Sequence, residues 1–244
     1  MKKLLLTLMV IGLTACLFVG CFSTPPIEPE PADRVVMIEL YMAIGCSHCE
    51  DVEPILEQLV EEYGNGQLVL VEEAGWGDYS TTEIFNRYKW YFPDSTDRGV
   101  PNILFNGLND RIHGSSDYST IKNKIDAELT KGSKIVITID SRNSISNTTT
   151  INGTIENVST SSLSNLEING MVFKEQPTVN LKYSVFDIFD EQKVEISSLA
   201  PEGSIDFSFT LEGVNWETDN VHGVIFVQAP DSSTKEILQA AYVE

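Results

Sequence analysis

Basic residues are scarce in this sequence. Its 244 residues include 16 Lys and Arg against 36 Asp and Glu, which gives a net charge of −20 at pH 7. Such a chain repels phosphate backbones and anionic lipid headgroups, so the charge disfavours a nucleic-acid partner or an electrostatic role at a membrane surface. With 42% hydrophobic and 21% charged residues the chain is not broadly disordered. The length allows one mid-sized domain plus a small one.

Cysteine is also rare. The chain has four cysteines, and Cys16 and Cys21 fall in an apolar N-terminal run, so Cys46 and Cys49 remain for the folded part. One pair excludes a disulfide framework for a domain of this size. The pair cannot complete a structural zinc site either, because no second Cys or His pair stands at ligand spacing. We therefore expect no metal site, and no cofactor apart from a redox-active Cys46–Cys49 disulfide.

Residues 1–21 have the pattern of a secretory signal, in which two lysines precede an apolar run from Leu4 to Phe22. The segments LTAC and FVGC, which end at Cys16 and Cys21, both resemble the lipobox of bacterial lipoproteins. We favour Cys21 as the lipidated residue, because polar residues follow it; Cys16 stays open. An uncleaved anchor helix is a further alternative, since the run is long enough to span a membrane. All three alternatives place the rest of the chain outside the cytoplasm.

Residues 22–33 separate this signal from the folded part. Their segment TPPIEPEPAD contains four prolines and three acidic residues, a composition that favours a stiff, extended chain. We expect a tether that spaces the folded part from the membrane and carries no chemistry.

The segment Cys46-Ser47-His48-Cys49 has a spacing suited to reversible chemistry. A disulfide across so short a loop removes little unfolded-chain entropy, so it is a poor structural staple. If Cys46 begins a helix, backbone N–H groups and the helix dipole stabilise its thiolate. Cys49 is then placed to resolve a mixed disulfide. An inert local disulfide is the alternative, and Cu(I) held by both cysteines and His48 is a weaker one.

The pattern of residues 34–132 predicts alternating strands and helices. Apolar runs indicate strands, and apolar residues at helical spacing indicate helices. An Asn106-Gly107 hairpin signal joins the last two strands. The expected order is strand, helix, strand, helix, strand, strand, helix. The strands are expected at residues 35–41, 68–71, 99–107 and 111–113, and the helices between Gly45 and Gly64 and at residues 81–90 and 118–129.

These features resemble the thioredoxin-like superfamily, in which a strand leads into a CxxC helix start and a Val-Pro pair opens a later strand. The resemblance implies an α/β fold with a central mixed sheet flanked by helices. It also implies that Cys46 is the attacking thiol, that Cys49 is the resolving thiol, and that Pro101 is a cis-proline beside them. Val100 is then expected to offer backbone hydrogen bonds to a bound substrate. An ordinary trans proline is the alternative at Pro101.

The residues around the two cysteines do not agree on whether the pair oxidises or reduces its substrate. Ser47 and His48 occupy the dipeptide that tunes the pair, and DsbA-type oxidants share its His. A passive, exposed His48 is the alternative. Negative charge from Glu50 onward opposes a thiolate at the first cysteine. The buried acid that thioredoxins carry six positions before it is replaced here by Leu40, so we expect no obvious proton acceptor for Cys49.

Residues 133–244 have a different character, with more Ser, Thr and Asn and no helical pattern. Their alternating segments predict an all-β, immunoglobulin-like sandwich without an inter-sheet disulfide, serving as a spacer or protein-binding module. The layout resembles that of certain bacterial surface and outer-membrane lipoproteins. Seven strands are expected, at residues 135–139, 149–158, 166–173, 179–186, 205–211, 221–227 and 237–243.

The sequence as a whole predicts an extracytoplasmic, membrane-tethered thiol–disulfide oxidoreductase. Its expected partners are protein thiols or disulfides and a separate redox partner, and its contact with the membrane runs through the N-terminal lipid or anchor. The alternative is a non-catalytic cell-surface binding lipoprotein, in which the sandwich carries the recognition. The substrate and the direction of electron flow do not follow from the residues.

Overall fold

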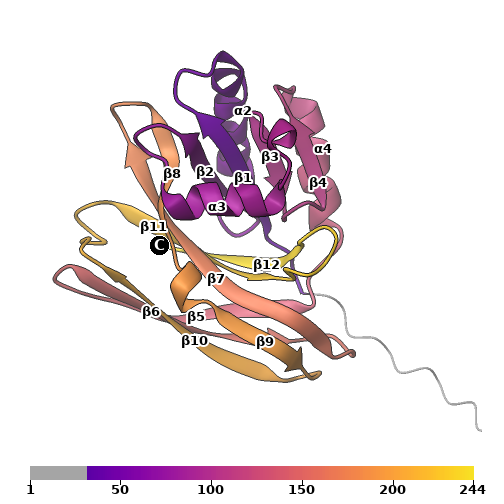
Figure 1. Cartoon of the computed structure of the whole chain (residues 1–244). Helices are drawn as coiled ribbons and strands as arrows, with labels where there is room; N and C mark the ends of the chain where they lie inside the picture. Colours follow the sequence, from indigo (N-terminus) through magenta and orange to yellow (C-terminus); the bar gives the residue numbers. More distant parts are fainter. Residues whose placement is uncertain (1–31) are drawn as a thin grey trace, which may run out of the picture.

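The computed structural model of the protein describes residues 32–244 (Figure 1). The expected signal, Cys16, Cys21 and the tether up to residue 31 lie outside the described residues, so the predictions made for them stay predictions. Within residues 32–244, no helix combines the length and the apolar character needed to cross a membrane.

Residues 34–132 contain strands and helices in the order that the sequence predicts, with ends shifted by a few residues. Thr81 and Asp117 cap two of the helices, because their side chains accept hydrogen bonds from the backbone N–H of Ile84 and Thr120. The elements are β1 (Val36–Ala43), α2 (Ser47–Tyr63), β2 (Leu68–Trp76), α3 (Thr82–Tyr91), the 3-10 turn η2 (Ser95–Asp97), β3 (Asn102–Phe105), β4 (Asp110–His113) and α4 (Tyr118–Leu129).

Residues 133–244 form eight strands, whereas the sequence predicts seven. The missed strand is β9, where consecutive serines at 197 and 198 interrupt the apolar alternation and only Ile196 and Leu199 are buried. The elements are β5 (Ile135–Ile145), β6 (Thr148–Asn157), β7 (Leu163–Gln176), β8 (Leu181–Ile188), the 3-10 turn η3 (Asp190–Gln192), β9 (Val194–Leu199), β10 (Ser204–Glu212), β11 (Val221–Gln228) and β12 (Ile237–Val243).

The two parts of the chain share one sheet, an arrangement that the sequence analysis does not predict. The strand order is β12-β11-β7-β8-β2-β1-β3-β4, with β9 paired to β7. The junction is β8, which lies antiparallel to β7 and parallel to β2, where Ser184 faces Glu72. A second sheet has the order β10-β6-β5. The predicted boundary between residues 132 and 133 stays a prediction, but the sheet continues across it.

The hydrophobic core has three parts. Two lie on opposite faces of the large sheet where β1 runs, and the third lies where the second sheet packs against the large one. On one face of β1, Ile38 and Leu40 pack with α2 and α4. On the other face, Met37 packs with α3 and with residues of β11 and β12, among them Phe226. The third part fills the space between the two sheets. Because the second part contains residues from both halves of the chain, burial of apolar surface stabilises the halves together.

A buried ion pair also connects the halves. Strand alternation places Glu39 on the face opposite Leu40, and there Arg87 of α3 donates to its carboxylate at 2.6 Å. The hydroxyl of Tyr91 donates to the other carboxylate oxygen at 2.8 Å. Arg87 also donates to Gln228 of β11 at 3.2 Å. This network therefore links β1 and α3 to a strand of the C-terminal half.

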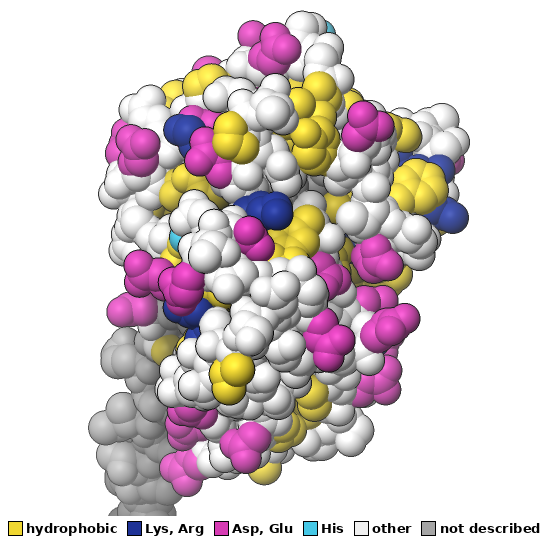
Figure 2. All heavy atoms as spheres, turned by 90° about the vertical axis from the view of Figure 1, so that its left-hand side faces the viewer, with side chains coloured by type: hydrophobic (Ala, Val, Ile, Leu, Met, Phe, Trp, Pro, Cys, Tyr) yellow, Lys and Arg dark blue, Asp and Glu magenta, His cyan; other side chains and the backbone are white. Residues whose placement is uncertain are grey.

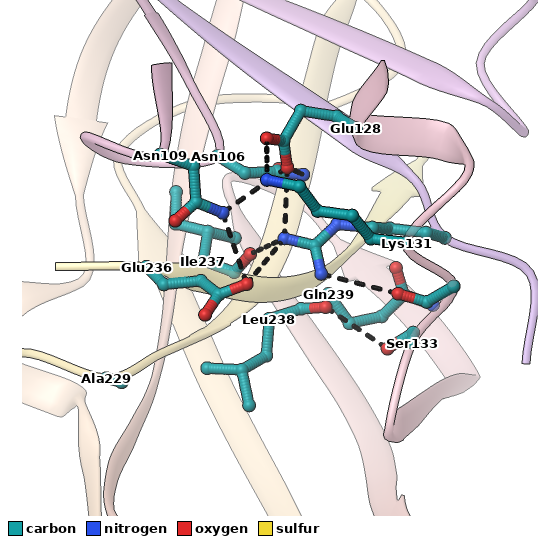
Figure 3. A network of polar contacts seen from close by, with 12 residues as sticks. Asn106, Asn109, Glu128, Lys131, Ser133, Ala229, Glu236, Ile237, Leu238 and Gln239 are labelled. Carbon is teal, nitrogen blue, oxygen red and sulfur yellow. Dashed lines mark hydrogen bonds and ion pairs between the residues drawn. The ribbon is translucent and has the colours of Figure 1, made fainter. Parts of the chain in front are cut away.

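A second polar network surrounds Arg34, just before β1. Figure 3 labels its partners Glu128, Glu236 and Ile237. The Arg34 guanidinium pairs with Glu128 at the end of α4, at 3.3 Å, and with Glu236 just before β12, at 2.9 Å. It also donates to the Ile237 carbonyl oxygen at 3.0 Å. Arg34 and Glu128 are both almost fully buried. The network joins the start of the described chain, α4 and the last strand.

Candidate functional site

Cys46 and Cys49 form a disulfide at the start of α2, immediately after β1, with their Cα atoms 5.3 Å apart. The chain turns there through Gly45, whose φ of 75° is unfavourable for other residues. Cys46 is the residue that caps the helix, and its Sγ accepts a hydrogen bond from the Cys49 backbone N–H at 3.3 Å. The same N–H and the helix N-terminus would stabilise a Cys46 thiolate after reduction.

The two sulfur-bearing residues differ in exposure. Cys46 is partly exposed, whereas Cys49 is fully buried in the core between α2, α4 and the sheet. A reactant in solution therefore has access to Cys46 and not to Cys49. This asymmetry fits the order in which the sequence analysis expects the two thiols to act, although the roles themselves stay predictions.

The Val100–Pro101 peptide bond is cis, as the sequence analysis expects. The carbonyl oxygen of Val100 lies 3.9 Å from Cys46 Sγ, so the chain brings residues 54 positions apart together at one end of the sheet. Val100 is partly exposed and Pro101 is buried. A bound polypeptide at Cys46 would lie next to the Val100 backbone, and this contact with a substrate stays a prediction.

Tyr88 of α3 holds the Val100 loop in place, a role that the sequence analysis misses. Its hydroxyl donates to the Gly99 carbonyl oxygen at 2.6 Å and accepts from the Asn102 amide at 3.0 Å. Its ring stacks on Tyr41 of β1 with centroids 4.0 Å apart. Burial raises the pKa of Tyr88 to about 12, so the hydroxyl stays protonated and able to donate. The sequence pattern gives no sign of this hydrogen-bond partner.

Ser47 and His48 lie in the first turn of α2, and both are exposed. His48 Nδ1 lies 3.7 Å from the Asp51 carboxylate, and 69% and 65% of these side chains are exposed. Contacts between such exposed groups are screened by water and contribute little energy. The structure thus places His48 beside an acidic side chain at the surface, and its tuning role stays a prediction.

A buried acid does lie on the Cys49 side of the sheet, in β2. Glu72 faces Leu40 across the β1–β2 pair, and its strand neighbours on the same face belong to the core that contains Cys49. One carboxylate oxygen accepts from the Tyr183 backbone N–H at 2.8 Å, and the other has no hydrogen-bond partner. Burial raises the pKa of Glu72 from 4.5 to about 8, with a smaller contribution from Glu53. The sequence analysis misses it because the predicted strand ends at residue 71.

Metal-ligating side chains do not gather anywhere in residues 32–244 as a group of three or more His, Cys, Asp or Glu. The groups that the structure brings together here are the two sulfur atoms, the Val100 backbone and the Glu72 carboxyl on the same side of the sheet.

Comparisons with known proteins give a likeness in fold. No protein-family model and no curated protein sequence matches the chain. HBP35 of Porphyromonas gingivalis superposes with a TM-score of 0.67 at 14% identity, over 86% of this chain and 75% of that chain. At this identity the likeness is one of fold alone. It covers both halves of the described chain.

Two further solved structures align with about half of the chain. A domain of the outer membrane lipoprotein Omp28 from Porphyromonas gingivalis has a TM-score of 0.33 at 12% identity, over 46% of this chain and 88% of that chain. A beta-glucosidase from Kluyveromyces marxianus has a TM-score of 0.28 at 15% identity, over 45% of this chain and 14% of that chain. Scores this low support no argument about function.

Proposed function

We propose that the protein is a thiol–disulfide oxidoreductase with a thioredoxin-like active site that acts on protein thiols or disulfides. One observation carries the proposal. The Cys46 sulfur is partly exposed at the start of α2 and 3.9 Å from the carbonyl oxygen that precedes cis-Pro101, with Cys49 buried behind it. This arrangement leaves one sulfur open to attack and keeps the other as the leaving or resolving group.

The reaction passes through a mixed disulfide. A substrate thiolate attacks Cys46 Sγ, the Cys46–Cys49 bond breaks, and Cys49 leaves as a thiolate that takes up a proton. A second substrate thiolate then attacks the substrate sulfur of the mixed disulfide and releases the Cys46 thiolate. The substrate dithiol becomes a disulfide, and its two electrons stay on the protein until a redox partner removes them. The same steps in reverse reduce a substrate disulfide.

We propose that Glu72 exchanges this proton with Cys49, since its strand neighbours pack in the core that contains Cys49. Its carboxyl lies on the same face of the sheet, has one oxygen without a partner, and changes its protonation state near pH 8. A group with a pKa close to the working pH both accepts and returns a proton efficiently.

The remainder of the chain supplies position and support. We propose that β5–β12 include an immunoglobulin-like sandwich that serves as a spacer or protein-binding module. The apolar N-terminal run would attach the protein to a membrane outside the cytoplasm, through a lipid on Cys21 or Cys16 or as an anchor helix. The likeness to HBP35, which covers both halves, supports a working unit made of both.

Single cysteine variants test the proposal. Cys46→Ser should abolish thiol–disulfide exchange, whereas Cys49→Ser should accumulate a mixed disulfide between Cys46 and a disulfide substrate, visible by mass spectrometry and released by a reductant. Ser197→Ala, at an exposed position in β9, is the matched control and should exchange at the unaltered rate. If both cysteine variants exchange as fast as the natural protein, the oxidoreductase is excluded and the binding-protein alternative remains.

A further inference from the structure

The rim of the Cys46 site is apolar. Three large hydrophobic side chains of residues 32–244 are exposed, and two of them, Ile44 and Trp76, are 44% and 42% exposed. Trp76 pairs with Ala43 at the end of the β1–β2 ladder, and Ile44 follows Ala43 in the turn that leads to Cys46. Ile44 is therefore two positions before Cys46, and Trp76 lies beside Ala43, three positions before Cys46.

The apolar rim, formed by Ile44 and Trp76, contacts the loop of the cis-proline through Tyr88. The Trp76 ring meets the Tyr88 ring edge to face, with centroids 6.1 Å apart, and the Tyr88 hydroxyl binds the Gly99 carbonyl oxygen. Three residues after Trp76, the Tyr79 hydroxyl lies 3.1 Å from Thr178 Oγ1 in the β7–β8 turn. The C-terminal half thus contributes to the edge of the site.

The chain segment that contains this rim has charge of one sign. From residue 35 to residue 86 the chain contains no Lys or Arg and eleven Asp and Glu. Figure 2 shows acidic and hydrophobic side chains close together at the upper end of the molecule, where Figure 1 shows β1 running into α2. The exposed acidic residues of this segment are Glu50, Asp51, Glu61, Glu62, Asp78 and Glu83.

The nearest basic side chains along the other edge of the site are held within their own loop. Arg98 donates to the Phe92 carbonyl oxygen at 3.2 Å. Arg111 donates to the Asn102 side chain and to the Asp97 carbonyl oxygen, each at 2.7 Å. An incoming chain therefore meets exposed negative charge at the start of α2, whereas the Arg98 and Arg111 guanidinium groups are held by hydrogen bonds to their own loop.

We propose that the substrate of the Cys46–Cys49 pair is a cationic polypeptide segment that packs an apolar side chain, next to its own cysteine, against Ile44 and Trp76. This inference rests on the proposed function and adds the class of substrate to it. Opposite charge accelerates the encounter, because it raises the local concentration of the partner. An aromatic or aliphatic side chain on Trp76 covers exposed apolar surface and fixes the substrate sulfur near Cys46.

Two matched peptides test the charge. Each has one cysteine beside a phenylalanine, flanked by lysines in one peptide and by glutamates in the other, and the oxidised protein is mixed with each. Because flanking lysines lower the thiol pKa, each rate is divided by that peptide's rate with a small neutral disulfide. The lysine peptide should react on the order of tenfold faster at low salt, and added salt should remove most of the difference.

Protein variants then locate the effect. Asp51→Asn with Asp78→Asn should reduce the preference for the lysine peptide, whereas Glu202→Gln with Glu212→Gln, in the distant second sheet and its turn, should leave it unchanged. Trp76→Ala should slow the phenylalanine peptide and not a glycine version of it. Three results would overturn the inference without excluding the oxidoreductase. They are equal exchange rates for the two charged peptides, a lysine preference that the Asp51 and Asp78 variants do not change, and an unchanged rate of Trp76→Ala with the phenylalanine peptide. If neither peptide reacts at all, the proposed function fails as well.

Discussion

Glu72 makes stability depend on pH. Its carboxyl has a pKa of about 8 in the folded protein, against an ordinary value of 4.5, so the folded protein keeps a proton that the unfolded chain releases. The contribution is fully present below pH 4.5 and is lost as pH rises through about 8. Each pKa unit corresponds to about 1.4 kcal/mol, so the free energy of unfolding should fall by a few kcal/mol between about pH 5 and pH 9.

Glu72→Gln should remove this dependence, because the amide cannot ionise and keeps an oxygen for the Tyr183 N–H. We expect the variant to be more stable than the natural protein at pH 9 and similar to it at pH 5. Urea unfolding at the two pH values measures this, with the exposed Glu212→Gln as control. If the free energy of unfolding changes equally with pH in the natural protein and in Glu72→Gln, Glu72 is ionised in the folded protein and the account is wrong.

Tyr88 and Tyr41 have stacked rings, but their hydroxyl groups differ in hydrogen bonding. The Tyr88 hydroxyl holds the Gly99 carbonyl oxygen, while the buried Tyr41 hydroxyl has no hydrogen-bond partner. Tyr88→Phe should cost about 1–2 kcal/mol of stability and slow exchange at Cys46 by about tenfold, because the Val100 loop loses its support. Tyr41→Phe should leave both unchanged. Equal exchange rates for the two variants would remove Tyr88 from the site.

At the residue scale, the sequence predicts the cysteine pair and the cis-proline, because both have a recognisable spacing along the chain. It does not predict Tyr88 or Glu72, since their importance comes from partners far away in the sequence. Glu72 acquires its raised pKa from burial in the sheet, where it lies between β1 and β8, and β8 is a strand more than a hundred residues later. No local pattern carries that information.

The β3–β4 hairpin shows how one turn residue determines an element. Asn106 and Gly107 have φ values of 48° and 72°, and a Cβ at Gly107 would collide with the Lys235 backbone. Gly107→Ala should therefore destabilise the protein by about 1–3 kcal/mol. Gly66→Ala, where a Cβ meets open space and φ is not positive, should be neutral or slightly stabilising. Thermal unfolding of both variants measures this, and equal midpoints would contradict the account.

Elements with their own local signal are predicted well from the sequence. α4 has the predicted bounds, since Asp117 caps its start and its apolar residues recur at helical spacing. β8 is predicted as a strand, but its pairing with β2 is not, because alternation shows that a segment is extended and not which strand lies beside it. β9 is missed because its apolar alternation is broken.

The stability of the whole molecule depends on contacts between its two halves. Arg34 makes several of these contacts, with Glu128, Glu236 and the Ile237 carbonyl oxygen. Its removal leaves Glu128 and Glu236 without their shared cation, and the Glu128 side chain is only 3% exposed. Arg34→Met should cost about 2–3 kcal/mol, because Lys131 still pairs with Glu128 and limits the loss. Lys124→Met, which breaks the more exposed pair with Asp110, should cost less than about 1 kcal/mol. Chemical unfolding of the two variants measures the difference, and similar losses would show that the buried network contributes no more than a surface pair.

The central claim concerns the whole protein as a redox catalyst, and the most direct measurement is the equilibrium of the Cys46–Cys49 pair in a series of glutathione buffers. Free thiols are alkylated and counted by mass spectrometry, from both the oxidised and the reduced starting state. The account predicts one reversible two-electron transition, the same from both directions, between about −120 mV, typical of strong oxidants, and about −270 mV, typical of reductants. A pair that stays oxidised across the whole series, or that does not reform after reduction, would contradict it.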